Sequence, residues 1–180
     1  EIVGGAKPAA SVLNCGESGL CIRMFAPIAA LFGREIALTA GGSLMKRDVG
    51  MVEAPIEKLG ASCSTGGGVP PVRVKGPMHG GRLEIDGSKS SQFLTGLLMA
   101  LPLCDGNSEL RVSNLKSKPY VEMTLELLDK FGIGVDADEE LVEFSIPGAQ
   151  SYVPSDYEVE GDWSGAAFLL VAGAIAGRVE

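Results

Sequence analysis

The sequence has few of the residues that build metal centres and disulfide frameworks. It holds a single histidine, His79, and four cysteines, none of them in a CxxC spacing. Structural zinc sites need several Cys and His ligands at short spacings, so no metal site is expected. Cysteines without a paired spacing are typical of a protein in a reduced compartment, which favours a cytoplasmic location.

Long apolar runs and an excess of positive charge are also missing. The longest apolar run, residues 166–176, is interrupted by Gly173, and a membrane span needs about 18–20 apolar residues. No membrane partner and no signal peptide are therefore expected. The net charge of −8 argues against a nucleic-acid partner.

Charge is unevenly distributed along the chain, and signatures of common catalytic sites are absent. Residues 1–90 carry ten basic and eight acidic residues, whereas residues 91–180 carry five and fifteen. Any anion-binding arginine or lysine is therefore expected in the first half. The sequence has no GK[ST] of a P-loop and no GxSxG segment. The lone histidine lies in a glycine-rich turn, which disfavours a Ser-His-Asp triad.

Strand-like and helix-like hydrophobic patterns occur twice in the same order. The first copy predicts strands near 12–14, 35–39, 62–64 and 72–74 and helices over 18–31 and 49–59, with Gly33 and Gly60 ending the helices. The second predicts strands near 82–86, 109–112, 135 and 142–146 and helices over 90–101 and 119–131. An offset of 72 residues relates Ser18 to Ser90 and Gly60 to Gly132. The repeat predicts an α/β fold of βαβαββ units over residues 1–76 and 77–150, with a further, truncated unit starting in 151–180.

Small polar residues follow a glycine where the first helix of each unit starts, as in 16–19 (GESG) and 87–92 (GSKSSQ). These residues could be ordinary N-caps, or hydroxyl and amide groups that hold a phosphate or carboxylate at a helix N-terminus. Cations precede the second helices, at Lys46-Arg47 and at Lys118. A cation at a helix start opposes the dipole, so it indicates either a bound anion or a solvated surface charge. Arg23 lies within an apolar helix and is expected to have an anionic partner, either Glu17 or a ligand.

These segments resemble the family of 5-enolpyruvylshikimate-3-phosphate (EPSP) synthases, the 3-phosphoshikimate 1-carboxyvinyltransferases. The resemblance rests on residues 86–94 (DGSKSSQFL), 117–120 (SKPY), 45–47 (MKR), 160–162 (EGD) and 16–23 (GESGLCIR), and it extends over essentially the whole chain. It implies an inside-out α/β domain of three βαβαββ units around a pseudo-threefold axis. The activity implied is transfer of the enolpyruvyl group of phosphoenolpyruvate to shikimate 3-phosphate, with release of phosphate and without a metal or other cofactor.

The resemblance also assigns substrate-binding residues to particular positions. Those that match shikimate 3-phosphate residues are Ser90, Ser91, Gln92, Ser117 and Tyr120, and those that match phosphoenolpyruvate residues are Gly19, Arg23, Arg47 and again Gln92. Hydroxyl groups at helix N-termini suit a phosphate, and the planar fork of an arginine suits a carboxylate or phosphate.

The sequence departs from the family pattern at Glu17, Leu20 and Asp48, where Asn, Thr and Pro are common. The N-terminal Lys-Ser motif of the family, its catalytic Asp and Lys and two further arginines are not found. The resemblance therefore implies a central fragment, inactive alone, whose partner is the remainder of the same enzyme. A stand-alone binding or structural domain with the same fold, or a relative of UDP-N-acetylglucosamine enolpyruvyl transferase, are the alternatives.

Overall fold

The computed structural model describes residues 10–89, 91–159 and 161–177, and within them the chain forms two four-stranded sheets. The first sheet has the order β1-β2-β4-β3, and the second has the matching order β5-β6-β8-β7. In each sheet the first pair is parallel and the other pairs are antiparallel. The strands are β1 (Val12–Asn14), β2 (Glu35–Thr39), β3 (Ser62–Ser64), β4 (Val72–Lys75), β5 (Arg82–Asp86), β6 (Ser108–Ser113), β7 (Asp136–Ala137) and β8 (Glu143–Ile146).

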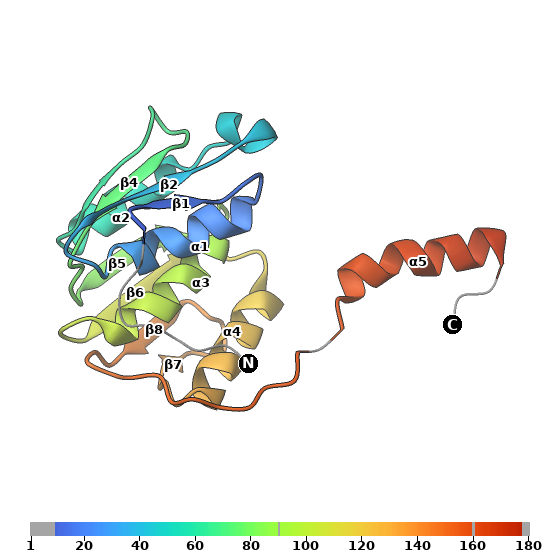
Figure 1. Ribbon diagram of the computed structural model, residues 1–180. Coiled ribbons are helices and arrows are strands. Elements are labelled where there is room, and N and C mark those ends of the chain that lie inside the picture. The colour runs from blue at the N-terminus through green and yellow to red at the C-terminus, as the bar shows by residue number, and fades with distance from the viewer. Residues whose placement is uncertain (1–9, 90, 160, 178–180) are drawn as a thin grey trace.

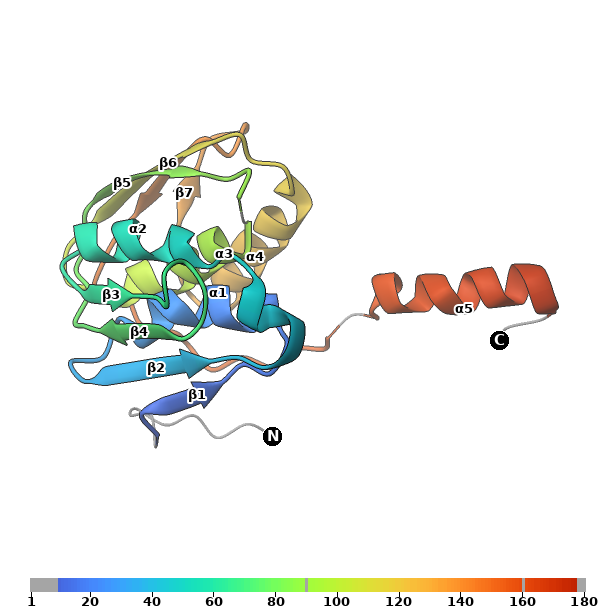
Figure 2. The same ribbon diagram turned by 90° about the horizontal axis from the view of Figure 1, so that it is seen from above.

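Helices connect the strands and lie between the two sheets (Figures 1 and 2). Helix α1 (Gly19–Ala29) joins β1 to β2, and α3 (Ser91–Ala100) joins β5 to β6. Helices α2 (Glu53–Lys58) and α4 (Lys118–Lys130) lead into the antiparallel hairpins. Three short 3-10 helices among the described residues are η1 (Gly42–Lys46), η2 (Gly50–Val52) and η3 (Leu101–Leu103). The predicted α/β class, with strands and helices in the predicted order, is confirmed, whereas the unit boundaries at residues 76 and 150 stay predictions.

The core lies where α1 and α3 pack against each other between the sheets. Alternation along the strands turns apolar residues inward, as in β6, where Leu110 and Val112 are buried and Glu109 and Arg111 are exposed. The helices contribute fully buried side chains such as Ile22, Leu94, Leu97 and Leu98. The sheets therefore present their charged faces to solvent while the helices fill the interior.

Two sequence-based expectations about helix ends are wrong. Helix α1 ends at Ala29 with Ala30 as its C-cap, so Gly33 does not cap it. The carbonyl groups of Ala30 and Phe32 instead accept hydrogen bonds from the N–H groups of Met78 and Gly76, at 2.8 and 2.9 Å. The last carbonyl groups of α1 itself accept from the N–H groups of Ala30, Leu31 and Phe32, so the helix end needs no glycine cap, and the distant segment holds the turn that follows.

The second error concerns Lys46-Arg47, which do not stand at the start of α2. Lys46 ends the 3-10 helix η1 and Arg47 is its C-cap, whereas α2 begins only at Glu53. Gly42 has φ +51° and the side chain of Leu44 is fully buried, so a separate short helix forms here. Arg47 therefore does not lie at the N-terminus of α2, and the dipole of that helix does not act on its charge.

Helix α5 (Trp163–Ala176) stands away from this body in both views (Figures 1 and 2). Its apolar side chains face solvent, with Phe168 80% and Ile175 82% exposed. The helix has 14 residues, and no helix in the described part of the chain is long and apolar enough to cross a membrane.

Candidate anion-binding site

The N-terminus of α1 is capped by Ser18, whose hydroxyl accepts a hydrogen bond from the N–H of Cys21 at 3.1 Å. Capping and anion binding were the two alternatives for this segment, and the cap is present. A single cap leaves other N–H groups of the first turn available, because a helix start exposes four. The positive end of the α1 dipole therefore remains a feature of this region.

Arg23 crosses from α1 to two other segments. Its Nη1 donates to Oε1 of Gln92 on α3 at 3.2 Å, and its Nη2 donates to the carbonyl of Asp48 at 3.0 Å. Its Nε is buried and has no hydrogen-bond partner among the described residues. Burial, followed by the charge of Arg47, lowers the pKa of Arg23 below its ordinary value, and Asp48 opposes the shift. Glu17 is not the partner of Arg23, because its carboxylate accepts from the N–H of Ser43 at 2.9 Å.

Arg47 lies beside Arg23 over the first turn of α1. A Cβ placed on Gly19 would lie 2.8 Å from Nη1 of Arg23 and 3.7 Å from Nη1 of Arg47. Neither arginine forms an ion pair with a carboxylate in the described ranges. Two guanidinium groups without an ion-pair partner, at the positive end of a helix, form a site that favours an anion. Glycine at position 19 leaves the space in which both groups lie.

The starts of α3 and α4 line a neighbouring cavity of about 660 Å³. The predicted residues Ser91, Gln92, Ser117 and Tyr120 all line it, whereas Ser90 lies outside the described residues. Ser117 is the N-cap of α4 but makes no capping hydrogen bond through its side chain, so its hydroxyl is available to a ligand. The structure thus brings these polar groups from two helix starts to one cavity, with Gln92 between them and Arg23.

Lys118 does not contribute to the cationic site. Its Nζ lies 2.8 Å from Oε2 of Glu140, in the turn between β7 and β8. The side chains of the pair are 40% and 76% exposed, so this contact is a surface ion pair of small energetic weight. The acidic residues 136–140 belong to β7 and the turn that joins it to β8, and Asp138 accepts hydrogen bonds from the N–H groups of Val142 and Glu143.

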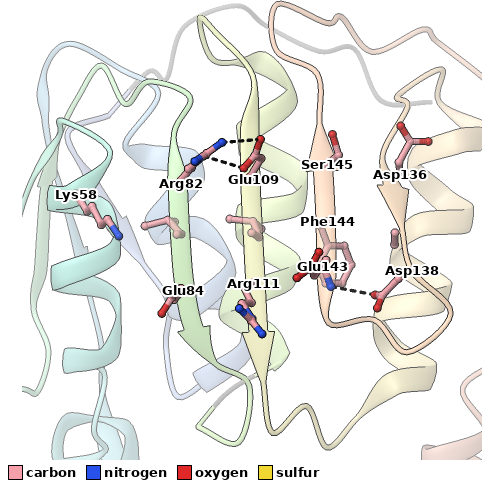
Figure 3. Close-up of a pocket in the computed structure, with 13 residues that line it drawn as sticks. Lys58, Arg82, Glu84, Glu109, Arg111, Asp136, Asp138, Glu143, Phe144 and Ser145 are labelled. Carbon is pink, nitrogen blue, oxygen red and sulfur yellow. Dashed lines mark hydrogen bonds and ion pairs between the residues drawn. The ribbon is translucent and has the colours of Figure 1, made fainter.

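An open groove of about 610 Å³ lies on the outer face of the second sheet, away from these helix starts. Figure 3 shows alternating charged side chains along its strands. Arg82 pairs with Glu109 at 2.8 Å, and Arg111 is in register with Glu84 on one side and Glu143 on the other. Opposite charges on neighbouring strands stabilise an exposed sheet face, so this groove is explained without a ligand.

Two contacts of the site were not predicted from the sequence. The carbonyl of Asp48 fixes Arg23, and a backbone acceptor leaves no signal in the residue types. Tyr152 lines the cavity and its hydroxyl donates to the carbonyl of Met99 at 2.8 Å. Burial raises the pKa of Tyr152 to about 12. It lies in an extended segment without hydrophobic periodicity, so no pattern pointed to it.

Solved structures place this architecture in a known fold class. An EPSP synthase of Acinetobacter baumannii superposes with a TM-score of 0.75 at 26% identity, over 94% of this chain and 37% of that chain. The two repeated sheets around buried helices define a domain of the enolpyruvyl transferase fold, which confirms the predicted fold class. The sequence pattern of the family described as EPSP synthase (3-phosphoshikimate 1-carboxyvinyltransferase) matches residues 3–180, and the chain belongs to this family.

Relatives named 3-phosphoshikimate 1-carboxyvinyltransferase are similar over nearly the whole chain. The relative from Halobacterium salinarum is 40% identical over 96% of this chain and 41% of its own length. The relative from Klebsiella pneumoniae is 38% identical over 98% of this chain and 43% of its own length. The chain thus spans about two fifths of the length of the relatives it matches.

Proposed function

We propose that the protein containing this chain transfers the enolpyruvyl group of phosphoenolpyruvate to shikimate 3-phosphate. The observation that carries the proposal is the pair of guanidinium groups over Gly19, joined through Gln92 to the cavity that Ser91 and Ser117 line. Two anionic substrates that must meet need two adjacent anion sites. Family membership supports this assignment over a stand-alone domain of another function.

The two parts of the site suit different substrates. Arg23 and Arg47 offer the planar, permanently charged groups that bind a carboxylate or phosphate in a bidentate manner. Ser91 and Ser117, at the starts of α3 and α4, offer hydroxyl groups beside helix N-termini, which suit the phosphate of shikimate 3-phosphate. Tyr120 also lines this cavity. Gln92 contacts Arg23 and the cavity, so its amide lies where both substrates would be adjacent.

The chemical contribution of these residues is binding and orientation. Holding two reactants together converts a bimolecular step into an effectively unimolecular one. Proton transfer to the enol carbon and from the attacking hydroxyl needs an acid and a base near the reacting atoms. From the resemblance we expect the family's catalytic Asp and Lys to lie outside these 180 residues. We therefore expect the isolated chain to bind substrates weakly and to catalyse no transfer.

Measurement of phosphate release from phosphoenolpyruvate and shikimate 3-phosphate tests whether this chain binds the substrates but needs the rest of the protein for catalysis. The full-length protein should release phosphate only when both substrates are present, and the 180-residue chain should stay at background. If the full-length protein binds shikimate 3-phosphate but releases no phosphate, the binding-domain alternative replaces this proposal. Turnover that co-purifies with the isolated chain would contradict the expected inactivity.

Substitution of Arg47 by lysine in the full-length protein tests the assignment of the substrates. Loss of a bidentate contact to a desolvated anion typically costs about 2–5 kcal/mol, so the KM for phosphoenolpyruvate should rise about 30-fold or more. The KM for shikimate 3-phosphate should change little. Arg73, which pairs with Glu35 on the outer face of the first sheet, provides the control Arg73→Lys, expected to leave both constants unchanged. Equal weakening of both substrates by Arg47→Lys would contradict the assignment.

A further inference from the structure

Glu17 reaches from the turn after β1 across to the 3-10 helix η1. Its Oε2 accepts a hydrogen bond from the N–H of Ser43 at 2.9 Å. Its carboxylate occupies the space above Gly42, where a Cβ would lie 2.2–2.5 Å from the carboxylate atoms. Gly42 also has φ +51°, a left-handed conformation that favours glycine. Position 42 therefore accommodates the carboxylate only because it has no side chain.

A second contact joins the same two segments. The N–H of Gly41 donates to the carbonyl of Gly16 at 2.8 Å. The turn that contains Gly16 and Glu17 thus holds the start of η1 through one backbone and one side-chain hydrogen bond. At the other end of η1, the N–H of Arg47 donates to the carbonyl of Leu44 at 3.0 Å. Leu44 is fully buried, so η1 is fixed from its core side as well.

We propose that Glu17 is a positioning residue, which holds η1 against the start of α1 so that the Arg47 guanidinium lies over Gly19. The proposal rests on the proposed function only for the role of Arg47 in anion binding. The Glu17 carboxylate has two separable effects. Its oxygen orders η1 by accepting the hydrogen bond from Ser43. Its negative charge, close to Arg47, opposes the binding of an anionic ligand to Arg47.

Glutamine and alanine at position 17 separate these two effects. In Glu17→Gln the oxygen of the new side-chain amide can accept from the N–H of Ser43 but carries no charge, whereas Glu17→Ala removes both the acceptor and the charge. Glu53→Ala is a matched control, because Oε1 of Glu53 accepts from the N–H of Thr65 at 2.6 Å and this bond fixes a different loop. Its loss should leave Arg47 unaffected.

Relaxation of ¹⁵N nuclei in the ligand-free 180-residue chain measures the order of η1 directly. Order parameters at residues 43–47 and at the Arg47 Nε–H group should fall in Glu17→Ala and stay at wild-type values in Glu17→Gln and Glu53→Ala. Titration of the full-length protein and its variants with phosphoenolpyruvate then measures binding. We expect affinity to fall about three- to tenfold in Glu17→Ala, as for one lost hydrogen bond, and to equal or exceed wild type in Glu17→Gln.

The two readouts keep this proposal distinct from the proposed function. If Arg47 stays ordered in Glu17→Ala, or if Glu17→Gln loses order as much as Glu17→Ala does, the positioning role is refuted. If phosphoenolpyruvate shifts no resonance of Arg23 or Arg47 in the full-length wild-type protein, the proposed substrate site is refuted instead. The ligand-free order parameters decide the role of Glu17 in either case.

Discussion

Replacing Gly96 with alanine should force apart the two helices at the centre of the molecule. A Cβ at this position of α3 would lie 2.5 Å from the carbonyl oxygen of Met24, 2.9 Å from its Cα and 3.0 Å from its carbonyl carbon. All three are backbone atoms of α1, which cannot rotate away as a side chain can. Ordinary contact begins at 3.4 Å, so α1 and α3 would have to separate by about 0.9 Å at the crossing.

The size of the effect follows from two opposing contributions. Overpacking of a well-packed core typically costs about 1–3 kcal/mol, and a clash with backbone belongs at the upper end of that range or beyond it. Alanine is a better helix former than glycine by about 1 kcal/mol, which offsets part of the cost. We therefore expect Gly96→Ala to lower the free energy of unfolding by about 2 kcal/mol.

Urea denaturation followed by far-UV circular dichroism measures this loss. Gly19→Ala is the control, because its new methyl group would meet the end of the flexible Arg23 side chain, 2.8 Å away, which can move. The free energy of unfolding of Gly19→Ala should remain near that of the wild-type chain. If Gly96→Ala is as stable as wild type, or if both variants lose the same amount, the close backbone approach of α1 and α3 is refuted.

Three further predictions concern thiols, acid and helix α5. Burial raises the pKa of Cys15 and Cys63 to about 12 and of Cys104 to about 11. Iodoacetamide should therefore modify only the half-buried Cys21 in the folded chain and all four cysteines in denaturant, as measured by mass spectrometry. Rapid modification of Cys63 in the folded chain would contradict this prediction. Hydrogen bonds from Ser43, Ser88 and Glu143 lower the pKa values of Glu17, Asp86 and Asp138 below their usual 4.5, 3.8 and 3.8. The stability that these carboxylates contribute is present above those usual values and is lost as the pH falls through the lowered ones. The denaturation midpoint should therefore decrease when the pH is lowered below about 4, and it should decrease less in Asp138→Asn. The exposed apolar surface of α5 should make the 180-residue chain associate with rising concentration in analytical ultracentrifugation, and Phe168→Glu with Ile175→Glu should reduce that association.

The strands and helices were largely predictable because their signals are local. Short runs between turn residues, apolar at 35–39 and alternating at 82–86, placed the strands at 35–39, 62–64 and 82–86 with the bounds that the structure has. The errors lie where a distant segment decides the local conformation. The turn after α1 is held by the N–H groups of Gly76 and Met78, which donate to the carbonyls of Phe32 and Ala30, and no hydrophobic period in residues 18–33 contains that information.

The site was predictable in its residue types but not in its contacts. Ser91, Gln92 and Ser117 were singled out as polar groups at helix starts, and they line one cavity. The contact of Arg23 with the carbonyl of Asp48, and that of Glu17 with the N–H of Ser43, each join a side chain to a backbone group about 25 residues away. Such partners depend on how the chain packs, so sequence patterns do not indicate them.

The same 72-residue repeat that builds the core also explains why the site is asymmetric. The offset relates Met24 to Gly96, and these equivalent positions meet at the crossing of α1 and α3. It also relates the preceding residues, Arg23 and Thr95, and one turn towards the N-termini it relates Leu20 to Gln92. The pseudo-symmetric packing therefore brings two helix starts together, but one presents a guanidinium group and the other an amide, and these non-equivalent groups bond at 3.2 Å. Divergence at two positions of the repeated helices therefore sets a guanidinium group beside an amide, and the proposed function would use these two groups for two chemically different anionic substrates.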